Sequence, residues 1–94
     1  MEIDHKEQKK KGAFFIEENG ERLAELLYFI SAPGEMTIYH TEVSDKFRGE
    51  GIGQDLVAAA VNFARKNKLK VVATCPYAKK VIEQTTKFQD VLAG

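Results

Sequence analysis

A glycine-rich segment, residues 43–54, places the tightest constraint on the fold of this 94-residue chain. It holds three of the seven glycines, alternating with other residues: Gly49, Gly51 and Gly53. Residues 36–43 before it alternate like a strand, and residues 52–67 after it have helical spacing. Such an arrangement brings backbone N–H groups and a helix N-terminus together around an anion, usually a phosphate. The sequence therefore predicts an anion-binding turn.

Three strands joined by short turns are predicted before the anion-binding turn. Residues 13–18 have an aromatic and aliphatic centre, and the pair Asn19 and Gly20 favours the type I′ turn of a β-hairpin. Residues 22–31 carry apolar side chains at both odd and even positions, which predicts a central strand covered on both faces. A Pro-Gly turn leads into 36–43, so the three strands form an antiparallel meander.

The second half of the chain predicts a crossover connection. The helix at 52–67 is followed by a strand at 70–75, which should lie parallel to the preceding strand. Pro76 ends that strand and a short helix is predicted at 77–85, whereas 87–92 fits either a last short strand or an ordered tail. The predicted fold class is α+β, an antiparallel meander followed by a β-α-β crossover and a short helix.

Composition and charge exclude several classes of function. Residues 1–12 are polar and are predicted to be a leader, and residues 13–94 are long enough for a single small domain. The 14 basic residues balance 14 acidic ones, which argues against a general nucleic-acid or membrane-surface function. No apolar run approaches the roughly 20 residues of a membrane span. The single cysteine is typical of a reducing, cytoplasmic setting.

The glycine-rich segment resembles a known family signature. Arg48-Gly-Glu-Gly-Ile-Gly53 is similar to the R/Q-x-x-G-x-G/A motif of the GNAT N-acetyltransferases, and it lies between a strand and a long helix as it does there. Cys75-Pro-Tyr-Ala78 resembles the C-P-Y-A segment of a small GNAT-like subfamily. The resemblance spans residues 13–88 and implies a GNAT-like fold that binds acetyl-CoA or coenzyme A. The tight turn at 19–20 leaves no room for the two helices that usually help shape the acceptor cleft.

The resemblance assigns cofactor contacts to residues of the glycine-rich segment and the last helix. Backbone N–H groups of 48–54 would hold the pyrophosphate, and the Arg48 side chain would either add a charge-assisted contact or be an ordinary surface arginine. Backbone groups of Val43 would meet the pantetheine arm, and Phe47 would pack on that arm or in the core. Lys79 would reach a phosphate or be a plain exposed lysine. The expected cofactor-binding residues are Val43, Phe47, Arg48, Gly49, Gly51, Ile52, Gly53, Gln54, Tyr77 and Lys79.

Two residues are candidates for chemistry at the reacting end. Cys75 precedes a helix whose N-terminus favours the thiolate, so it would either accept an acetyl group or line the acyl pocket as a small buried residue. Strict alternation along 36–43 puts the even-numbered residues, His40 and Glu42 included, on one face. His40 would be a general base facing the same thioester as Cys75, with Glu42 as second candidate, or a hydrogen-bonded sheet histidine. Tyr77 would protonate the leaving thiolate or pack against the core or cofactor.

Two leading functions follow from these assignments, and a third is more distant. The first is an acetyl-CoA-dependent acetyltransferase that acts on a small amine or a protein amine, directly or through a cysteine relay. The second is an acetyl-CoA or coenzyme A binding module without transferase activity of its own, and a more distant third is a phosphate-binding interaction domain. No spacing of His, Cys, Asp and Glu predicts a metal site. An under-covered sheet face is compatible with either a monomer or a weak homodimer.

Overall fold

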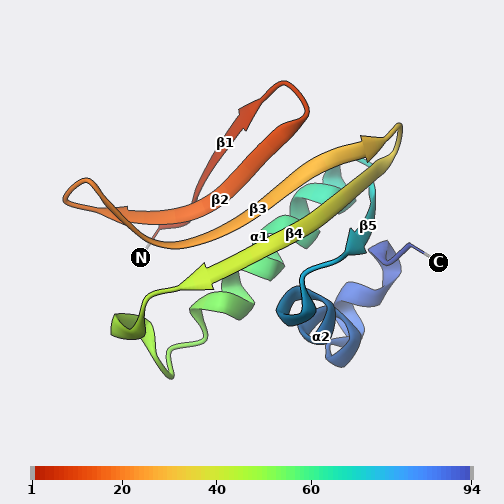
Figure 1. The fold of residues 1–94 in the computed structure, drawn as a ribbon. Coiled ribbons are helices and arrows are strands. Elements are labelled where there is room, and N and C mark those ends of the chain that lie inside the picture. Colours follow the sequence, from red (N-terminus) through yellow and green to blue (C-terminus); the bar gives the residue numbers. More distant parts are fainter. Residues whose placement is uncertain (1, 94) are drawn as a thin grey trace.

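The computed structural model describes residues 2–93 as one mixed sheet with helices packed against it (Figure 1). The elements in chain order are β1 (Asp4–Gln8), β2 (Lys11–Glu18), β3 (Glu21–Ala32), β4 (Glu35–Val43), η1 (Asp45–Phe47), α1 (Ile52–Lys66), β5 (Lys70–Ala73), α2 (Pro76–Gln84) and η2 (Thr86–Val91). The strands lie side by side in sequence order; β1 to β4 are antiparallel and β5 joins β4 in parallel. The predicted α+β class and its crossover are confirmed.

The core lies between the sheet and α1. The apolar stripe of α1 is fully buried and faces buried side chains of β3 and β4, among them Leu26, Tyr28, Met36 and Ile38. In Figure 1, α1 lies behind β3 and β4, and no helix crosses in front of β2, β3 or β4. Of the described helices, none has the length and apolar composition that crossing a membrane would require.

Strand β3 is central, but the expectation that both of its faces are covered is wrong. Leu26 and Tyr28 are buried toward α1, whereas Leu27 is only half-buried and Phe29 is 37% exposed on the opposite face. Phe29 packs there against Tyr39, with ring centroids 5.6 Å apart. We call this uncovered side of the sheet the open face.

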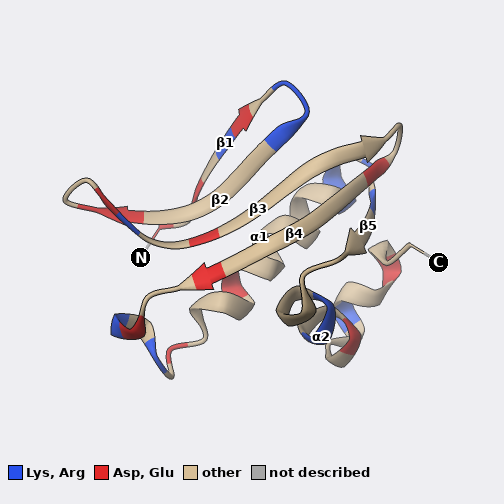
Figure 2. Ribbon diagram, viewed as in Figure 1, with Lys and Arg blue, Asp and Glu red and all other residues tan. Residues whose placement is uncertain are grey.

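The expected polar leader is wrong for much of residues 1–12, because residues 4–8 form an edge strand and β2 already begins at Lys11. Every residue of β1 is exposed, so the sequence has no apolar alternation that would predict this strand. Its backbone pairs with β2 in the register His5 opposite Phe14. The turn that joins the two strands is the basic run in Figure 2. Backbone pairing and one histidine, rather than an apolar face, hold this segment.

Strand β4 contains a β-bulge at Tyr39. Leu27 of β3 pairs with His40, yet the next residue, Tyr28, pairs with Ile38, so Tyr39 has no opposite residue. A bulge of this kind adds one residue to one strand and shifts the alternation of side chains beyond it.

The bulge overturns the predicted side-chain pattern of β4. Met36 and Ile38 are fully buried toward α1, as alternation predicts. After the bulge, the odd-numbered Thr41 continues on that side, and the even-numbered His40 and Glu42 turn to the open face. A period of two read from sequence cannot locate an extra residue, which is why the prediction fails here.

The C-terminal part closes the fold beside α1. Residues 87–92, predicted as a strand or a tail, lie mostly in η2, and Leu92 makes a single parallel bridge to Val71. Arg65 of α1 holds η2 by donating to both carboxylate oxygens of Asp90, at 2.9 and 2.7 Å, and to the Lys87 carbonyl at 2.7 Å. Strand β5 ends at Ala73, two residues before the predicted 70–75 boundary.

Candidate functional site

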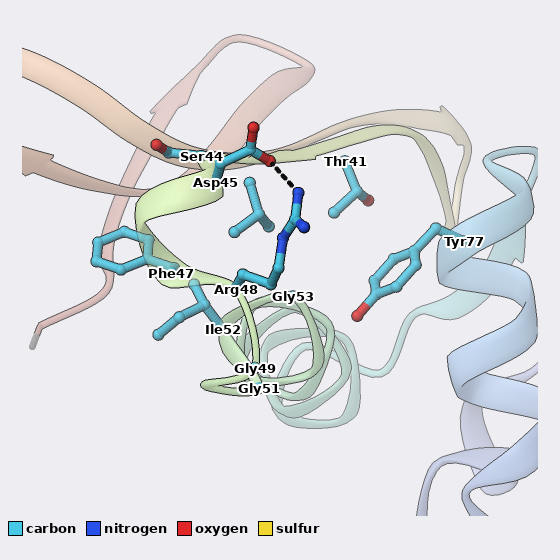
Figure 3. A pocket seen from close by; sticks show the side chains of 11 residues that line it. Thr41, Ser44, Asp45, Phe47, Arg48, Gly49, Gly51, Ile52, Gly53 and Tyr77 are labelled. Carbon is cyan, nitrogen blue, oxygen red and sulfur yellow. Dashed lines mark hydrogen bonds and ion pairs between the residues drawn. The ribbon is translucent and has the colours of Figure 1, made fainter.

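A cavity of about 370 Å³ opens between the end of β4 and the start of α1 (Figure 3). Its wall consists of the β4 end, the glycine-rich segment and one side chain of α2. The lining residues are Thr41, Val43, Ser44, Asp45, Phe47, Arg48, Gly49, Gly51, Ile52, Gly53 and Tyr77. The glycine-rich segment thus lies where the sequence places it, between strand and helix.

The first turn of α1 presents uncapped backbone N–H groups at this cavity. Gly49 and Gly51 have φ angles of +81° and +72°, in the left-handed region that favours glycine. Gly51 is the N-cap of α1, and no side-chain cap hydrogen bond is formed there. Because the first N–H groups of a helix have no partner within the helix, they remain available to an anion.

The side chain of Arg48 adds an exposed positive charge. Its Nη2 lies 3.3 Å from Asp45 Oδ1, and Figure 3 shows this pair across from Tyr77. Both side chains are more than four-fifths exposed, so their attraction is weak and water screens it. An anionic ligand can therefore recruit Arg48 without breaking a strong internal contact.

Strand β4 leaves part of its backbone without a sheet neighbour. Its pairing with β5 ends at Ile38 opposite Ala73. The N–H groups of Thr74 and Cys75 both donate to the Ile38 carbonyl, at 3.0 and 3.2 Å, and α2 then leads the chain away. Among the described strands, none pairs with residues 39–43 on that side, so an extended ligand with amide groups can lie there.

Cys75 is a free, buried thiol at the N-cap of α2. Its Sγ lies 3.5 Å from Oγ1 of Thr41, which lines the cavity. Burial is the largest single effect and raises the pKa of the thiol, but hydrogen bonds from the Ala78 backbone, the Thr41 hydroxyl, and the Tyr77 and Thr41 backbones together outweigh it. The sum of these effects lowers the pKa of Cys75, which favours the thiolate.

Tyr77 reaches from α2 across the mouth of the cavity. Its ring lies against Gly53, where a Cβ would overlap the Tyr77 hydroxyl and come within 2.8 Å of Cζ. Burial raises the pKa of Tyr77, and the negative charge of the neighbouring Cys75 thiolate raises it further. The phenol consequently keeps its proton at neutral pH and can donate it.

The structure brings most of the expected cofactor residues together, but not all. Gln54 is exposed on the first turn of α1 and does not line the cavity. Lys79 lines a different cavity, beside β5, with Glu83 and Leu92. Phe47 is buried in the core while also touching the cavity wall, so its predicted core role is present. Ser44 was missed although it is a typical cap; its Oγ accepts from the Lys46 N–H at 3.2 Å.

His40 is not brought to Cys75. The bulge turns its imidazole to the open face, where Nε2 lies 3.4 Å from Glu25 Oε2 and 3.4 Å from Glu42 Oε1. Thr41, which the sequence reading overlooked, takes the place beside Cys75 instead. The expectation that His40 and Cys75 face one thioester is therefore wrong in geometry.

Comparisons with known proteins agree with this architecture. The family model described as GCN5-related N-acetyl-transferase matches residues 13–91. Protein NATD1 of Xenopus tropicalis is 34% identical over 85 residues, which cover 89% of this chain and 76% of that protein. An NMR structure of a GCN5-like candidate N-acetyltransferase from Staphylococcus aureus shares 40% identity at a TM-score of 0.74, covering 99% of this chain and 88% of that one. A ribosomal-protein-alanine N-acetyltransferase of Brucella melitensis, at 18% identity, a TM-score of 0.65 and coverage of 93% and 66%, shares the fold.

Proposed function

Because the chain belongs to the GCN5-related N-acetyltransferase family, we propose that it binds acetyl-CoA between β4 and α1 and transfers the acetyl group to an amine. The acceptor is a small amine or a protein amine. The observation that carries this proposal is the uncapped first turn of α1, which faces the cavity next to the unpaired edge of β4. These features fit a ligand that has a pyrophosphate at one end and an amide-bearing arm.

Each part of the site has a separate task in binding. The N–H groups at the start of α1 hold the pyrophosphate, and Arg48 leaves Asp45 to add a charge-assisted contact. The free backbone of 39–43 pairs with the amides of the pantetheine arm and aligns it with β4. Acetyl-CoA bound in this way would supply an activated acetyl group as a thioester.

The residues at the reacting end handle a proton and a thiolate. Tyr77 is protonated at neutral pH and lines the cavity, so its hydroxyl donates a proton to the sulfur that leaves. Cys75 does not line the cavity itself but lies behind Thr41, which does. Its lowered pKa supports a role in which its sulfur takes the acetyl group before passing it on. His40, on the other side of β4 and away from Cys75, has no part in this scheme.

One observation favours a second candidate, an acetyl-CoA binding module without transferase activity. Strands β2 and β3 are joined directly by the turn at Asn19 and Gly20, and no helix covers the open face in Figure 1. The described residues thus build the cofactor half of a transferase site more fully than an acceptor cleft.

Two measurements test these functions in turn. Coenzyme A titrated into ¹⁵N-labelled protein should shift the amide resonances of residues 48–54; no shift there would exclude both candidates. Intact-mass spectrometry after incubation with acetyl-CoA should then show an acetyl adduct that is absent from Cys75→Ala. If Cys75→Ala still acetylates amines from a test panel, transfer is direct. If the unaltered protein shows neither an adduct nor turnover, the binding module is the function that remains.

A further inference from the structure

Three potential metal ligands converge on the open face, on the other side of β4 from the cavity. Glu25 of β3 lies directly across from Glu42 of β4, and His40 lies two residues before Glu42 on β4, on the same face of the sheet. Their ligand atoms all lie within 4.8 Å of one another. Figure 2 shows acidic segments on β3 and β4, consistent with this cluster. The bulge at Tyr39 creates the cluster, because without it His40 and Glu42 would face α1.

The two distances from the imidazole to the carboxylates match those around a tetrahedral ion. Bonds of about 2.0–2.1 Å from zinc to nitrogen or oxygen place neighbouring ligand atoms about 3.3–3.4 Å apart. The distances from His40 Nε2 to Glu25 Oε2 and to Glu42 Oε1 are both 3.4 Å. Hydrogen bonding alone satisfies this arrangement poorly, since a single imidazole N–H can donate well to only one of the two carboxylates.

The two facing carboxylates also favour a cation between them. Two glutamates directly opposite each other on antiparallel strands repel, which costs stability unless a positive charge lies between them. Arg22 contacts Glu25 through Oε1, at 3.2 Å, and leaves Oε2 turned toward His40. Arg22 is itself anchored, with its guanidinium carbon 4.1 Å from the centre of the Phe15 ring. A ligand carboxylate held by a fixed partner in this way is typical of metal sites.

We propose that Glu25, His40 and Glu42 bind Zn²⁺, or another divalent transition-metal ion with the same ligand preference, and leave a fourth position open to solvent. His40 contributes Nε2, and each glutamate contributes the oxygen that faces it. The His40 and Glu42 side chains are 41% and 73% exposed, so the ion exchanges with solution. Thr41, between them in sequence, faces the cavity, so this site and the cofactor cavity lie on opposite sides of one strand.

The test is a calorimetric titration of ZnCl₂ into tag-free, metal-depleted protein without coenzyme A. We expect one ion per chain and a perturbed His40 imidazole signal in NMR spectra. His40→Ala and Glu42→Gln should each weaken binding at least about tenfold, and Arg22→Gln should weaken it by a similar factor through the orientation of Glu25. Glu83→Gln, an exposed glutamate on α2, and Cys75→Ser serve as matched controls that should bind as the unaltered protein does.

Equal Zn²⁺ affinity in His40→Ala and the unaltered protein would overturn the proposal, as would binding lost only in Cys75→Ser. Circular dichroism of each variant shows whether the fold is retained, and Glu42→Gln, at an exposed position, gives a readout should another variant fail to fold. The measurement needs no acetyl-CoA. Failure of the metal site is therefore distinguishable from failure of the proposed acetyl transfer.

Discussion

The imidazole of His5 stacks on the ring of Phe14, with centroids 4.1 Å apart and planes inclined by 9°. Its Nε2 lies 2.6 Å from the hydroxyl of Tyr28, and the edge of the Phe63 ring from α1 completes the contact. Burial lowers the pKa of His5, which Glu7 partly opposes, and burial raises the pKa of Tyr28 to about 12. Strand β1 is thus held to the domain by a neutral histidine.

Because of this contact, the free energy of unfolding should decrease as pH decreases. Because the folded pKa of His5 lies below its ordinary value of 6.5, the unfolded chain takes up a proton first as pH decreases. The contribution is complete above 6.5 and is lost as pH falls from there to the folded pKa. His5→Phe keeps the stacking and should flatten this part of the profile, measured by urea unfolding between about pH 8 and about pH 5.5. An unchanged slope in His5→Phe would contradict the assignment.

Gly12→Ala should destabilise the protein because the Tyr28 ring lies directly over this glycine. A Cβ at position 12 would overlap the Tyr28 hydroxyl and Cζ, and Tyr28 is only 1% exposed. We expect a loss of about 1–3 kcal/mol in the free energy of unfolding, as for other overpacked cores. The neighbouring Lys11→Ala, at an exposed position of the same strand, should change it by less than about 0.5 kcal/mol. Equal midpoints of urea unfolding for Gly12→Ala and Lys11→Ala would contradict the close contact between Gly12 and the Tyr28 ring.

Gly49→Ala and Gly20→Ala form a matched pair for the cofactor site. Both glycines have φ of +81° and no atom within 4 Å of an added Cβ, so each variant should lose a similar 1–2 kcal/mol of stability, an approximate cost of the left-handed conformation. Of the two, only Gly49 lies in the cavity wall, where a methyl group would occupy the space in which we propose that the pyrophosphate binds. Coenzyme A affinity, measured by calorimetry, should fall at least about tenfold in Gly49→Ala alone. Equal coenzyme A affinities in Gly49→Ala and Gly20→Ala would show that the cofactor does not approach the backbone at Gly49.

Thr41→Val should make Cys75 less acidic. The Thr41 hydroxyl is one of the groups that lower the thiol pKa below its ordinary 9.0, and valine has nearly the same shape without it. The rate of alkylation by iodoacetamide should therefore rise at lower pH in the unaltered protein than in Thr41→Val. Thr74→Val is the control, since its hydroxyl donates to the Ile38 carbonyl rather than to the sulfur. Coincident pH profiles for the unaltered protein and Thr41→Val would show that the hydroxyl does not act on Cys75.

Local patterns predicted the parts of the site that depend on neighbours in sequence. Gly49 to Gly53 and the stripe of α1 lie as expected, because turn geometry and helical spacing are written in consecutive residues. The partner of Cys75 could not be predicted, since one unpaired residue at Tyr39 exchanges Thr41 for His40. Strand β1 escaped detection because its five side chains are all exposed.

Contacts between strands account for what remained hidden. Glu25 and His40 are fifteen residues apart in sequence, and only the register of β3 with β4 brings them together. Lys79 was expected to reach a phosphate of the cofactor, but it lies two positions after Tyr77 on α2, which turns its side chain to a different side of the helix. The contact of Glu25 with His40 has no signature in a single sequence, whereas helical spacing alone separates Lys79 from Tyr77.

The bulge at Tyr39 means that the length of β4, as much as its composition, decides which chemistry lies on each side of the sheet. Deleting that one residue would restore simple alternation and exchange the two sets of groups beyond it. The imidazole and carboxylate would move to the thiol, and the hydroxyl of Thr41 would move to solvent. In evolutionary terms, a three-base insertion or deletion at this codon would separate a thiol from an imidazole, or unite them, without substituting either.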